Sequence, residues 1–225
     1  MKHYWHDDYW LPLMQLYLEE PVGLKPLYSR HLVDLSLELH ITPQALLARM
    51  QQLSRLETPR IEHLWTIYSQ DPKRLKRAVR LLRSMRGFGD AGQFYDGVEV
   101  QETFEKDFRP VVTPDKDRVG SDLPLEQRLT PVMLVMILNL YFQLTSLTMV
   151  SSTPEVKELA KLLGLKAADV VHVLDIFQTC DPYLGRSEMV ISPLLLPCQQ
   201  VWQRFGNHEP AELHAYAEEL KEYFL

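Results

Sequence analysis

The spacing of apolar residues repeats along the chain, and this repeat predicts two helical domains. Positions 10–59 overlie positions 134–183 without a gap when the sequence is shifted by 124 residues. Few residues are identical, but apolar character is kept at the spacing of a buried helix face. A duplicated domain shows this pattern once its surface residues have diverged. The matched apolar pairs include Trp10 and Leu134, Leu32 and Val156, and Leu46 and Val170.

Each copy is expected to form three helices in a helix-turn-helix arrangement, followed by further helices. Pro43 and Pro154 stand at helix starts, where the missing N–H of proline costs nothing. The turn residue is His40 in the first copy and Gly164 in the second. Glycine adopts a positive φ without strain, whereas histidine only tolerates it, so the second copy keeps the better turn. The expected helices cover about 10–20, 30–40, 43–56 and 72–86, and then about 131–144, 154–163, 166–179, 197–206 and 209–224.

The sequence therefore predicts an all-α protein with two tandem helix-turn-helix units. The expected boundaries are 1–87 for the first copy, 88–128 for an acidic, irregular linker and 129–225 for the second copy. The linker holds ten acidic and five basic residues. Asp96-Gly97 lies between short β-prone runs and predicts at most one short β-hairpin there.

Composition favours a globular protein of the cytoplasm. The chain has 225 residues, 46% hydrophobic and 24% charged, with a formal net charge of −6. The polar, acidic start does not resemble a signal peptide, and no apolar run approaches the length of a membrane span. Cys180 and Cys198 are expected to be separate thiols. The negative net charge argues against attraction of the whole chain to nucleic acid, although individual segments differ in charge.

The second copy carries several motifs in a recognisable order. Pro154-Glu155-Val156-Lys157-Glu158-Leu159-Ala160-Lys161-Leu162-Leu163-Gly164 is followed by Cys180-Asp181-Pro182 and then by Val201-Trp202-Gln203-Arg204-Phe205. This pattern resembles the helix-turn-helix-like domain that precedes HNH nuclease modules in some predicted restriction enzymes. The resemblance covers residues 129–224 well and the first copy only faintly. It implies a DNA-associated helical domain, and the catalytic histidines and asparagine of the nuclease have no counterpart here.

Two helices of the first copy carry the residue types that contact DNA. The third helix presents Gln44, Arg49, Gln52 and Arg55, and arginine and glutamine bind base edges and phosphates in a major groove. The next helix is strongly basic, and no acid interrupts it. Residues 42–90 hold ten basic and four acidic residues, a local charge of +6 in an acidic chain. The phosphate-binding candidates are Lys73, Arg74, Lys76, Arg77 and Arg80.

Two other interpretations of these surfaces stay open. A charge run is commonly only a solvated helix face. The basic helix could also dock acidic chain, because residues 207–225 hold five glutamates and one lysine. In the second copy, Asp169 and Asp175 would repel phosphates, while Val173 and Ile176 suggest packing against the first copy or another subunit, with plain core packing as the alternative. The candidate partners are therefore DNA, a protein partner or a second copy, without a membrane.

The sequence indicates no enzyme. The eight histidines are scattered and lack the acid and cysteine partners of a zinc site. The chain contains no glycine-rich phosphate loop and no nucleophile elbow. We therefore expect no catalytic residue, no metal and no cofactor. The leading hypothesis is a non-enzymatic, transcription-regulator-like DNA-binding protein that uses the first copy. The alternative is a protein-interaction or dimerisation module on the same fold.

Overall fold

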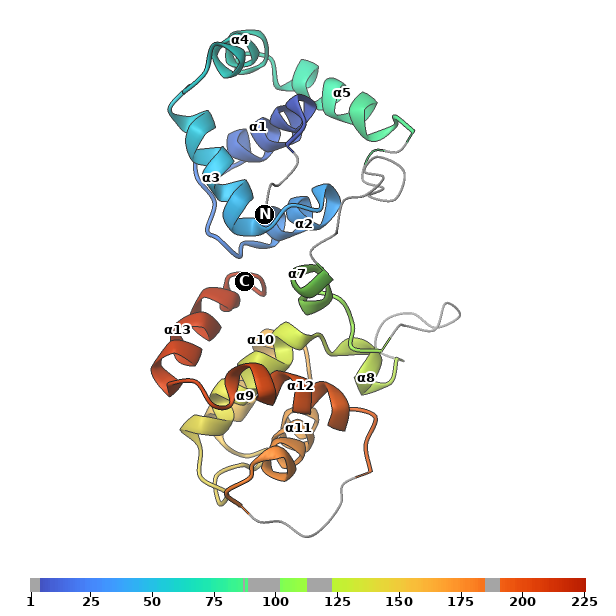
Figure 1. The fold of residues 1–225 in the computed structure, drawn as a ribbon, viewed down its shortest axis with the longest axis vertical. Coiled ribbons are helices and arrows are strands. Elements are labelled where there is room, and N and C mark those ends of the chain that lie inside the picture. Colours follow the sequence, from blue (N-terminus) through green and yellow to red (C-terminus); the bar gives the residue numbers. More distant parts are fainter. Residues whose placement is uncertain (1–4, 87, 89–101, 113–122, 185–190) are drawn as a thin grey trace. The chain divides into compact units, whose positions relative to one another are not determined.

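The chain is helical throughout the part that the structure describes. This computed structural model describes residues 5–86, 88, 102–112, 123–184 and 191–225. Every regular element within these ranges is a helix, which confirms the all-α prediction. The expected hairpin at Asp96-Gly97 lies outside the described residues. The chain divides into two compact units, Met1–Glu102 and Thr103–Leu225 (Figure 1). The division at 102 falls inside the stretch predicted to be a linker.

Unit 1 is built from helices that begin at strong sequence signals. Its elements are η1 (Asp7–Tyr9), α1 (Trp10–Leu18), α2 (Arg30–Leu39), α3 (Pro43–Ser54), α4 (Pro59–Tyr68) and α5 (Pro72–Arg83). Thr42 and Thr58 each accept a hydrogen bond from a backbone N–H of the first turn and precede a proline. Helix α4 was not predicted, although its Thr58-Pro59 start repeats the Thr42-Pro43 signal that predicted α3. The side chain of such a threonine satisfies an N–H that the helix leaves unpaired.

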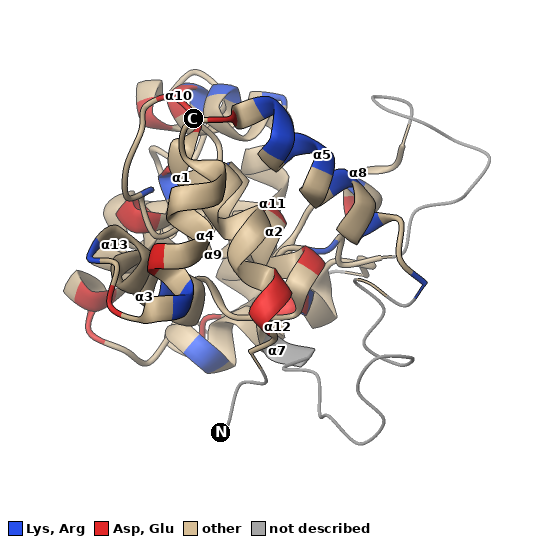
Figure 2. Cartoon of the chain, turned by 90° about the horizontal axis from the view of Figure 1, so that it is seen from above, with Lys and Arg blue, Asp and Glu red and all other residues tan. Residues whose placement is uncertain are grey.

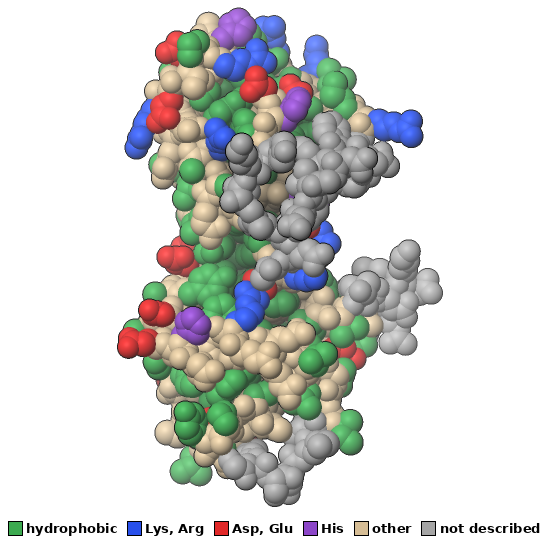
Figure 3. All heavy atoms as spheres, viewed as in Figure 1, with side chains coloured by type: hydrophobic (Ala, Val, Ile, Leu, Met, Phe, Trp, Pro, Cys, Tyr) green, Lys and Arg blue, Asp and Glu red, His purple; other side chains and the backbone are tan. Residues whose placement is uncertain are grey.

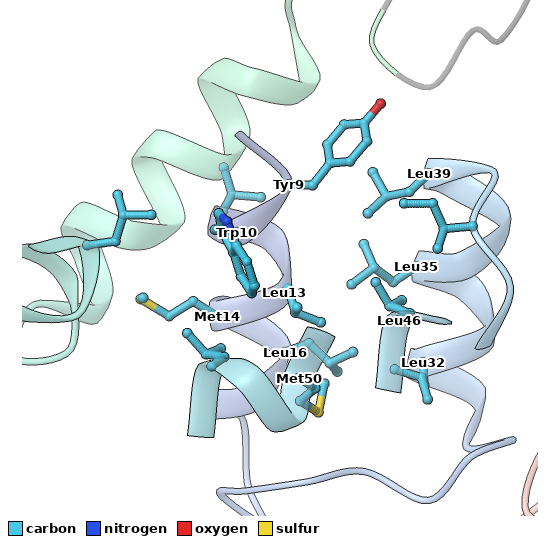
Figure 4. Packing of buried hydrophobic residues seen from close by; sticks show 14 of the residues in the cluster. Tyr9, Trp10, Leu13, Met14, Leu16, Leu32, Leu35, Leu39, Leu46 and Met50 are labelled. Atoms are coloured by element: carbon cyan, nitrogen blue, oxygen red, sulfur yellow. The ribbon is translucent and has the colours of Figure 1, made fainter. Parts of the chain in front are cut away.

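The core of unit 1 is centred on α1, which packs against α2, α3 and α5. Figure 4 shows Leu13 and Met14 of α1 among the side chains of neighbouring helices. Both are fully buried, as are Leu32 of α2 and Met50 of α3. After α1 the chain is held by Lys25, a 9% exposed lysine whose Nζ donates to the carbonyls of Glu19 (2.7 Å) and Pro21. These carbonyls follow the helix end, where a cation is favourable.

Unit 2 has the same local plan with two additional short helices before it. Its elements are α7 (Glu102–Asp107), α8 (Leu125–Arg128), α9 (Pro131–Gln143), α10 (Pro154–Leu163), α11 (Ala167–Cys180), α12 (Leu195–Phe205) and α13 (Pro210–Lys221). Helices α7 and α8 lie in the stretch predicted to be irregular. Within the described residues, no helix has both the length and the apolar character needed to cross a membrane.

The two units share helix bounds and a turn when their numbering is shifted by 124. Helix α2 (30–39) shifts onto 154–163, the bounds of α10, and α3 starts at 43, which shifts onto 167, the start of α11. His40 and Gly164 both adopt left-handed backbone conformation, with φ of 54° and 66°. The following N–H groups donate to equivalent carbonyls, from Ile41 to Ser36 at 3.0 Å and from Leu165 to Ala160 at 2.8 Å. Both turns thus close a helix with the same 6→1 hydrogen bond.

Helix α11 is enclosed by its own unit, which corrects one expectation. It packs against α9, α10 and α12. Val173 and Ile176, which were predicted to form an interface, are both 0% exposed and belong to this core. The packing of α11 against these three helices leaves both side chains buried, so the two extra apolar residues on this helix are explained by core packing. Trp202 of α12 contacts the rings of Tyr141 and Phe177.

On the face seen in Figure 3, apolar side chains are scattered over the surface of unit 2 (green in the lower part). The most exposed are Leu147, Tyr183 and Ile191. They lie in the connections on either side of α10 and α11 rather than on a helix face. Single exposed apolar residues are normal on a folded protein and carry no functional meaning alone.

Candidate nucleic-acid interface

Helix α5 turns the basic run of the sequence into an exposed cationic face. Asp71 caps the helix by accepting a hydrogen bond from the N–H of Arg74 at 2.9 Å. Leu75, Val79 and Leu82 are buried on the opposite side of the helix. The basic residues of the run are all exposed, and Figure 2 shows their positions in blue along α5. They are Lys73, Arg74, Lys76, Arg77, Arg80, Arg83 and, after the helix, Arg86.

The helix ends at Arg83, earlier than the predicted end near Gly87. Ser84 is the C-cap, and its hydroxyl donates to the carbonyl of Leu81 at 2.7 Å. This hydrogen bond and the tight turn of the backbone at Ser84 satisfy carbonyl groups that the helix end leaves free. Arg86 therefore follows α5 in an exposed turn and does not continue its face.

Most cations on α5 have no anionic partner among the described residues. Arg83 is the exception, because its Nε and Nη2 donate to Glu38 of α2 at 2.6 and 2.8 Å. This hydrogen bonding raises the pKa of Arg83, against the opposing effect of partial burial. The guanidinium of Arg74 lies 5.5 Å from the centre of the Tyr68 ring. Six cations of the run form no ion pair within the described ranges: Lys73, Arg74, Lys76, Arg77, Arg80 and Arg86.

The four candidate residues of α3 all have partners within unit 1. Gln44 donates to the hydroxyl of Tyr28 at 2.8 Å. Arg49 donates to Gln52 at 3.0 Å, and its guanidinium lies 5.1 Å from the centre of the Trp5 ring. A base contact by these side chains would replace an existing interaction rather than fill an empty one.

Arg55, the fourth candidate, is the C-cap residue that follows α3; it is exposed and forms an ion pair with Glu57 at 3.3 Å. The structure therefore brings Arg49 and Gln52 together but leaves Gln44 and Arg55 with separate partners. Helices α3 and α5 lie on opposite sides of α1 (Figures 1 and 2). The two predicted DNA-contacting sets consequently form two surfaces rather than one continuous face.

A polar groove that the sequence did not reveal lies between α1, α2 and the end of α5. It has a volume of about 170 Å³, with Leu16 and Leu35 among its apolar lining. Its polar lining comes from three helices and the chain after α1: Gln15, Glu19, His31, Asp34, Glu38 and Arg83. These residues are up to 68 positions apart (83 − 15 = 68), so only the folded arrangement of the helices brings them together.

Unit 2 has no comparable cationic helix in its described part. The only charged residue of α12 is Arg204, and it donates to Asp107 at 2.6 and 2.8 Å. These hydrogen bonds raise the pKa of Arg204. Asp169 of α11 accepts from Arg128 at 3.1 Å and from the N–H of Lys166 at 3.2 Å. The charged groups of unit 2 named here are thus engaged in fixing its own helices.

The described residues contain no group of three histidine, cysteine or acidic side chains arranged to hold a metal ion. Cys180 and Cys198 are free thiols. Burial raises the pKa of Cys180 to about 11, and burial also raises the pKa of Cys198, which is completely buried. Both thiols are therefore protonated at neutral pH, the form that is a poor nucleophile and a poor metal ligand.

No family model, curated protein or solved structure matches this chain. The resemblance to the domain that precedes HNH nuclease modules thus rests on the quoted motifs of the second copy alone.

Proposed function

We propose that unit 1 binds DNA through the exposed cationic face of α5, as a non-enzymatic, transcription-regulator-like protein with two helix-turn-helix units. The observation that carries the proposal is the set of α5 cations without anionic partners among the described residues. A row of lysine and arginine without anionic partners neutralises phosphates and releases their counterions. The free energy of this counterion release dominates the affinity of proteins for nucleic acid.

The arrangement supports binding to the phosphate backbone better than reading of base sequence. Lys73, Arg77 and Arg80 follow the i, i+4, i+7 spacing of one helix face, and their exposed ends can move to meet phosphates. Gln44, Arg49, Gln52 and Arg55 would have to exchange internal partners before they could contact bases. We therefore expect DNA binding that tolerates changes in base sequence.

Fluorescence anisotropy with a labelled, mixed-sequence duplex tests this proposal. At about 0.05 M salt, where surface charges are weakly screened, the full chain should bind the duplex. If five phosphates are neutralised, the logarithm of the affinity should fall with the logarithm of the salt concentration with a slope of about −4.5. An absence of binding at tens of micromolar protein in low salt would end the proposal.

A pair of matched variants assigns the surface. Lys73→Glu with Arg77→Glu reverses two charges on α5 and should weaken binding at least about tenfold. The control, Lys157→Glu with Lys161→Glu, makes the same charge change on two exposed lysines of α10 in unit 2. It should leave most of the affinity in place. Equal losses in the two variants would mean that net charge, and not α5, is responsible.

The second candidate function is a protein-interaction module built on the same fold. Gln44, Arg49, Gln52 and Arg55 already have partners within unit 1, which favours it, because a DNA-reading helix normally leaves such side chains free to contact bases. On this hypothesis, α5 docks an acidic protein surface. If the chain binds an acidic peptide but does not bind a duplex in low salt, the protein-interaction hypothesis is supported over DNA binding.

A further inference from the structure

The groove between α1 and α2 already binds one arginine side chain, that of Arg83. Its guanidinium forms two hydrogen bonds with Glu38 at the groove edge. The apolar lining includes Leu16 and Leu35, each 5% exposed, against which the methylene stem of a basic side chain can lie. The chemistry of the groove therefore suits a lysine or arginine with its head among carboxylates.

Two further carboxylates of the groove form no ion pair among the described residues. The Glu19 carboxylate accepts a hydrogen bond from Gln15 at 3.4 Å and helps to raise the pKa of Arg83 by electrostatic attraction, and Asp34 pairs with no cation. Both are exposed, and Glu20 adds a third exposed acid beside Glu19. The groove and its edge thus carry exposed negative charge that can attract further basic side chains from outside this copy.

The complementary charges lie on the helix that borders this groove. Lys76, Arg80 and Arg83 follow one another at i, i+4 and i+7, so they form a row along one side of α5. The last member of the row is the arginine bound to Glu38, and the first two have no anionic partner among the described residues. A positive row and a negative groove therefore lie side by side on unit 1.

We propose that unit 1 pairs with unit 1 of a second copy, each copy placing Lys76 and Arg80 in the groove of the other, against Glu19 and Asp34. Neighbouring surfaces of opposite charge suit a two-fold axis, because a rotation about it brings each surface onto its opposite. The exposed apolar residues Val22 and Leu24 follow the acidic pair Glu19-Glu20 and add area beside the charges. This proposal goes beyond DNA binding and does not depend on it.

Two variants that reverse charge on opposite sides of the contact test the pairing. The first is Lys76→Glu with Arg80→Glu, and the second is Glu19→Lys with Asp34→Lys. Neither replaces Arg83 or Glu38, the pair that fixes α5 to α2. In the first variant both surfaces are acidic, and in the second both are basic. Each variant alone should therefore associate at least about tenfold more weakly than the native chain.

Sedimentation velocity of the full chain, without nucleic acid, measures the outcome. In salt of about 0.05 M the native chain should approach the mass of a dimer as its concentration rises, and about 0.5 M salt should return it to a monomer. An equimolar mixture of the two variants should recover the dimer, because both contacts of the mixed pair again join opposite charges. The matched control, Lys157→Glu with Lys161→Glu, should associate like the native chain.

Three results would overturn the proposal. The native chain could stay monomeric at every concentration in low salt, the mixture could stay monomeric, or mass could grow in steps beyond the dimer, which two reciprocal contacts exclude. Misfolding of either variant would show in its circular dichroism. In that case the single substitutions Arg80→Gln and Asp34→Asn replace the charge reversals, and each should also weaken association. Loss of DNA binding with an intact dimer would separate failure of the proposed function from failure of this pairing.

Discussion

Units 1 and 2 contain equivalent helices but differ in which charged side chains these helices leave free in solvent. In unit 1, α3 has an exposed side and α5 presents cations to solvent. In unit 2, α11 also keeps an exposed side, but its acid Asp169 is bound by Arg128, and Arg204, the one cation of α12, is bound by Asp107. The comparison teaches that a repeated helix pattern determines the local fold, whereas the helices packed around it determine which surface stays accessible.

The largest expected effect tests whether equivalent core positions contribute equally to the free energy of unfolding. Leu53 and Phe177 correspond under the shift of 124, and both are completely buried. Phe177→Ala should reduce the free energy of unfolding by about 3–5 kcal/mol and Leu53→Ala by about 2–5 kcal/mol, because each leaves a cavity.

Denaturant unfolding measures these losses, and hydrogen exchange with mass spectrometry assigns each loss to a unit. Phe177→Ala should speed exchange chiefly in peptides of unit 2, where its ring contacts Trp202 and Tyr141. Leu53→Ala should act chiefly in unit 1. Equal acceleration in both units after either change would show that the units unfold together.

A smaller effect tests the two turns directly. Gly164→Ala should destabilise unit 2 by about 1–2 kcal/mol, because an alanine in left-handed conformation is strained. A Cβ added there meets no atom within 4 Å, so the loss reports backbone conformation alone. The reverse change, His40→Gly, should stabilise unit 1 by about 0.5 kcal/mol. Relief of backbone strain is partly offset because glycine loses more conformational freedom on folding. Thermal unfolding of the two variants should move in opposite directions.

The smallest effect concerns the start of the basic helix. Asp71→Ala removes the capping hydrogen bond to Arg74 and should cost about 1 kcal/mol. Asp71→Asn keeps an acceptor at the cap and should retain most of that stability while removing the charge. Helix α12, which occupies the matching place in unit 2, has no side-chain cap, so this dependence is specific to α5 within that pair of helices. Equal losses for Ala and Asn, measured by denaturant unfolding, would indicate that charge rather than capping stabilises α5.

Much of the fold could be predicted from the sequence because its helices begin at local signals. Thr42-Pro43 and Asp71-Pro72 combine a capping side chain with a proline that needs no hydrogen bond, and they mark two helices correctly. Helix α4 carries the same signal and was missed because it buries only Ile61 and Leu64, too weak an apolar pattern to stand out. The short helix α8 buries no residue at all.

The exposure of the α5 cations could also be predicted, since Leu75, Val79 and Leu82 define the buried side of that helix. The partners of the α3 residues could not, because Trp5 and Tyr28 reach them from segments outside the helix pattern. The pairing of Arg83 with Glu38 joins residues 45 positions apart and depends on how α5 lies beside α2. Local periodicity contains no information about such contacts.

The lysine that is buried after α1, Lys25, can report whether unit 1 is folded. Lys25 is 9% exposed and donates to two backbone carbonyls, whereas Lys73 and Lys76 lie open on α5. An amine engaged in this way is shielded from acylating reagents while the surrounding loop is folded. Acetylation of the native protein should therefore mark the α5 lysines before Lys25, and modification of Lys25 should coincide with opening of the chain around it.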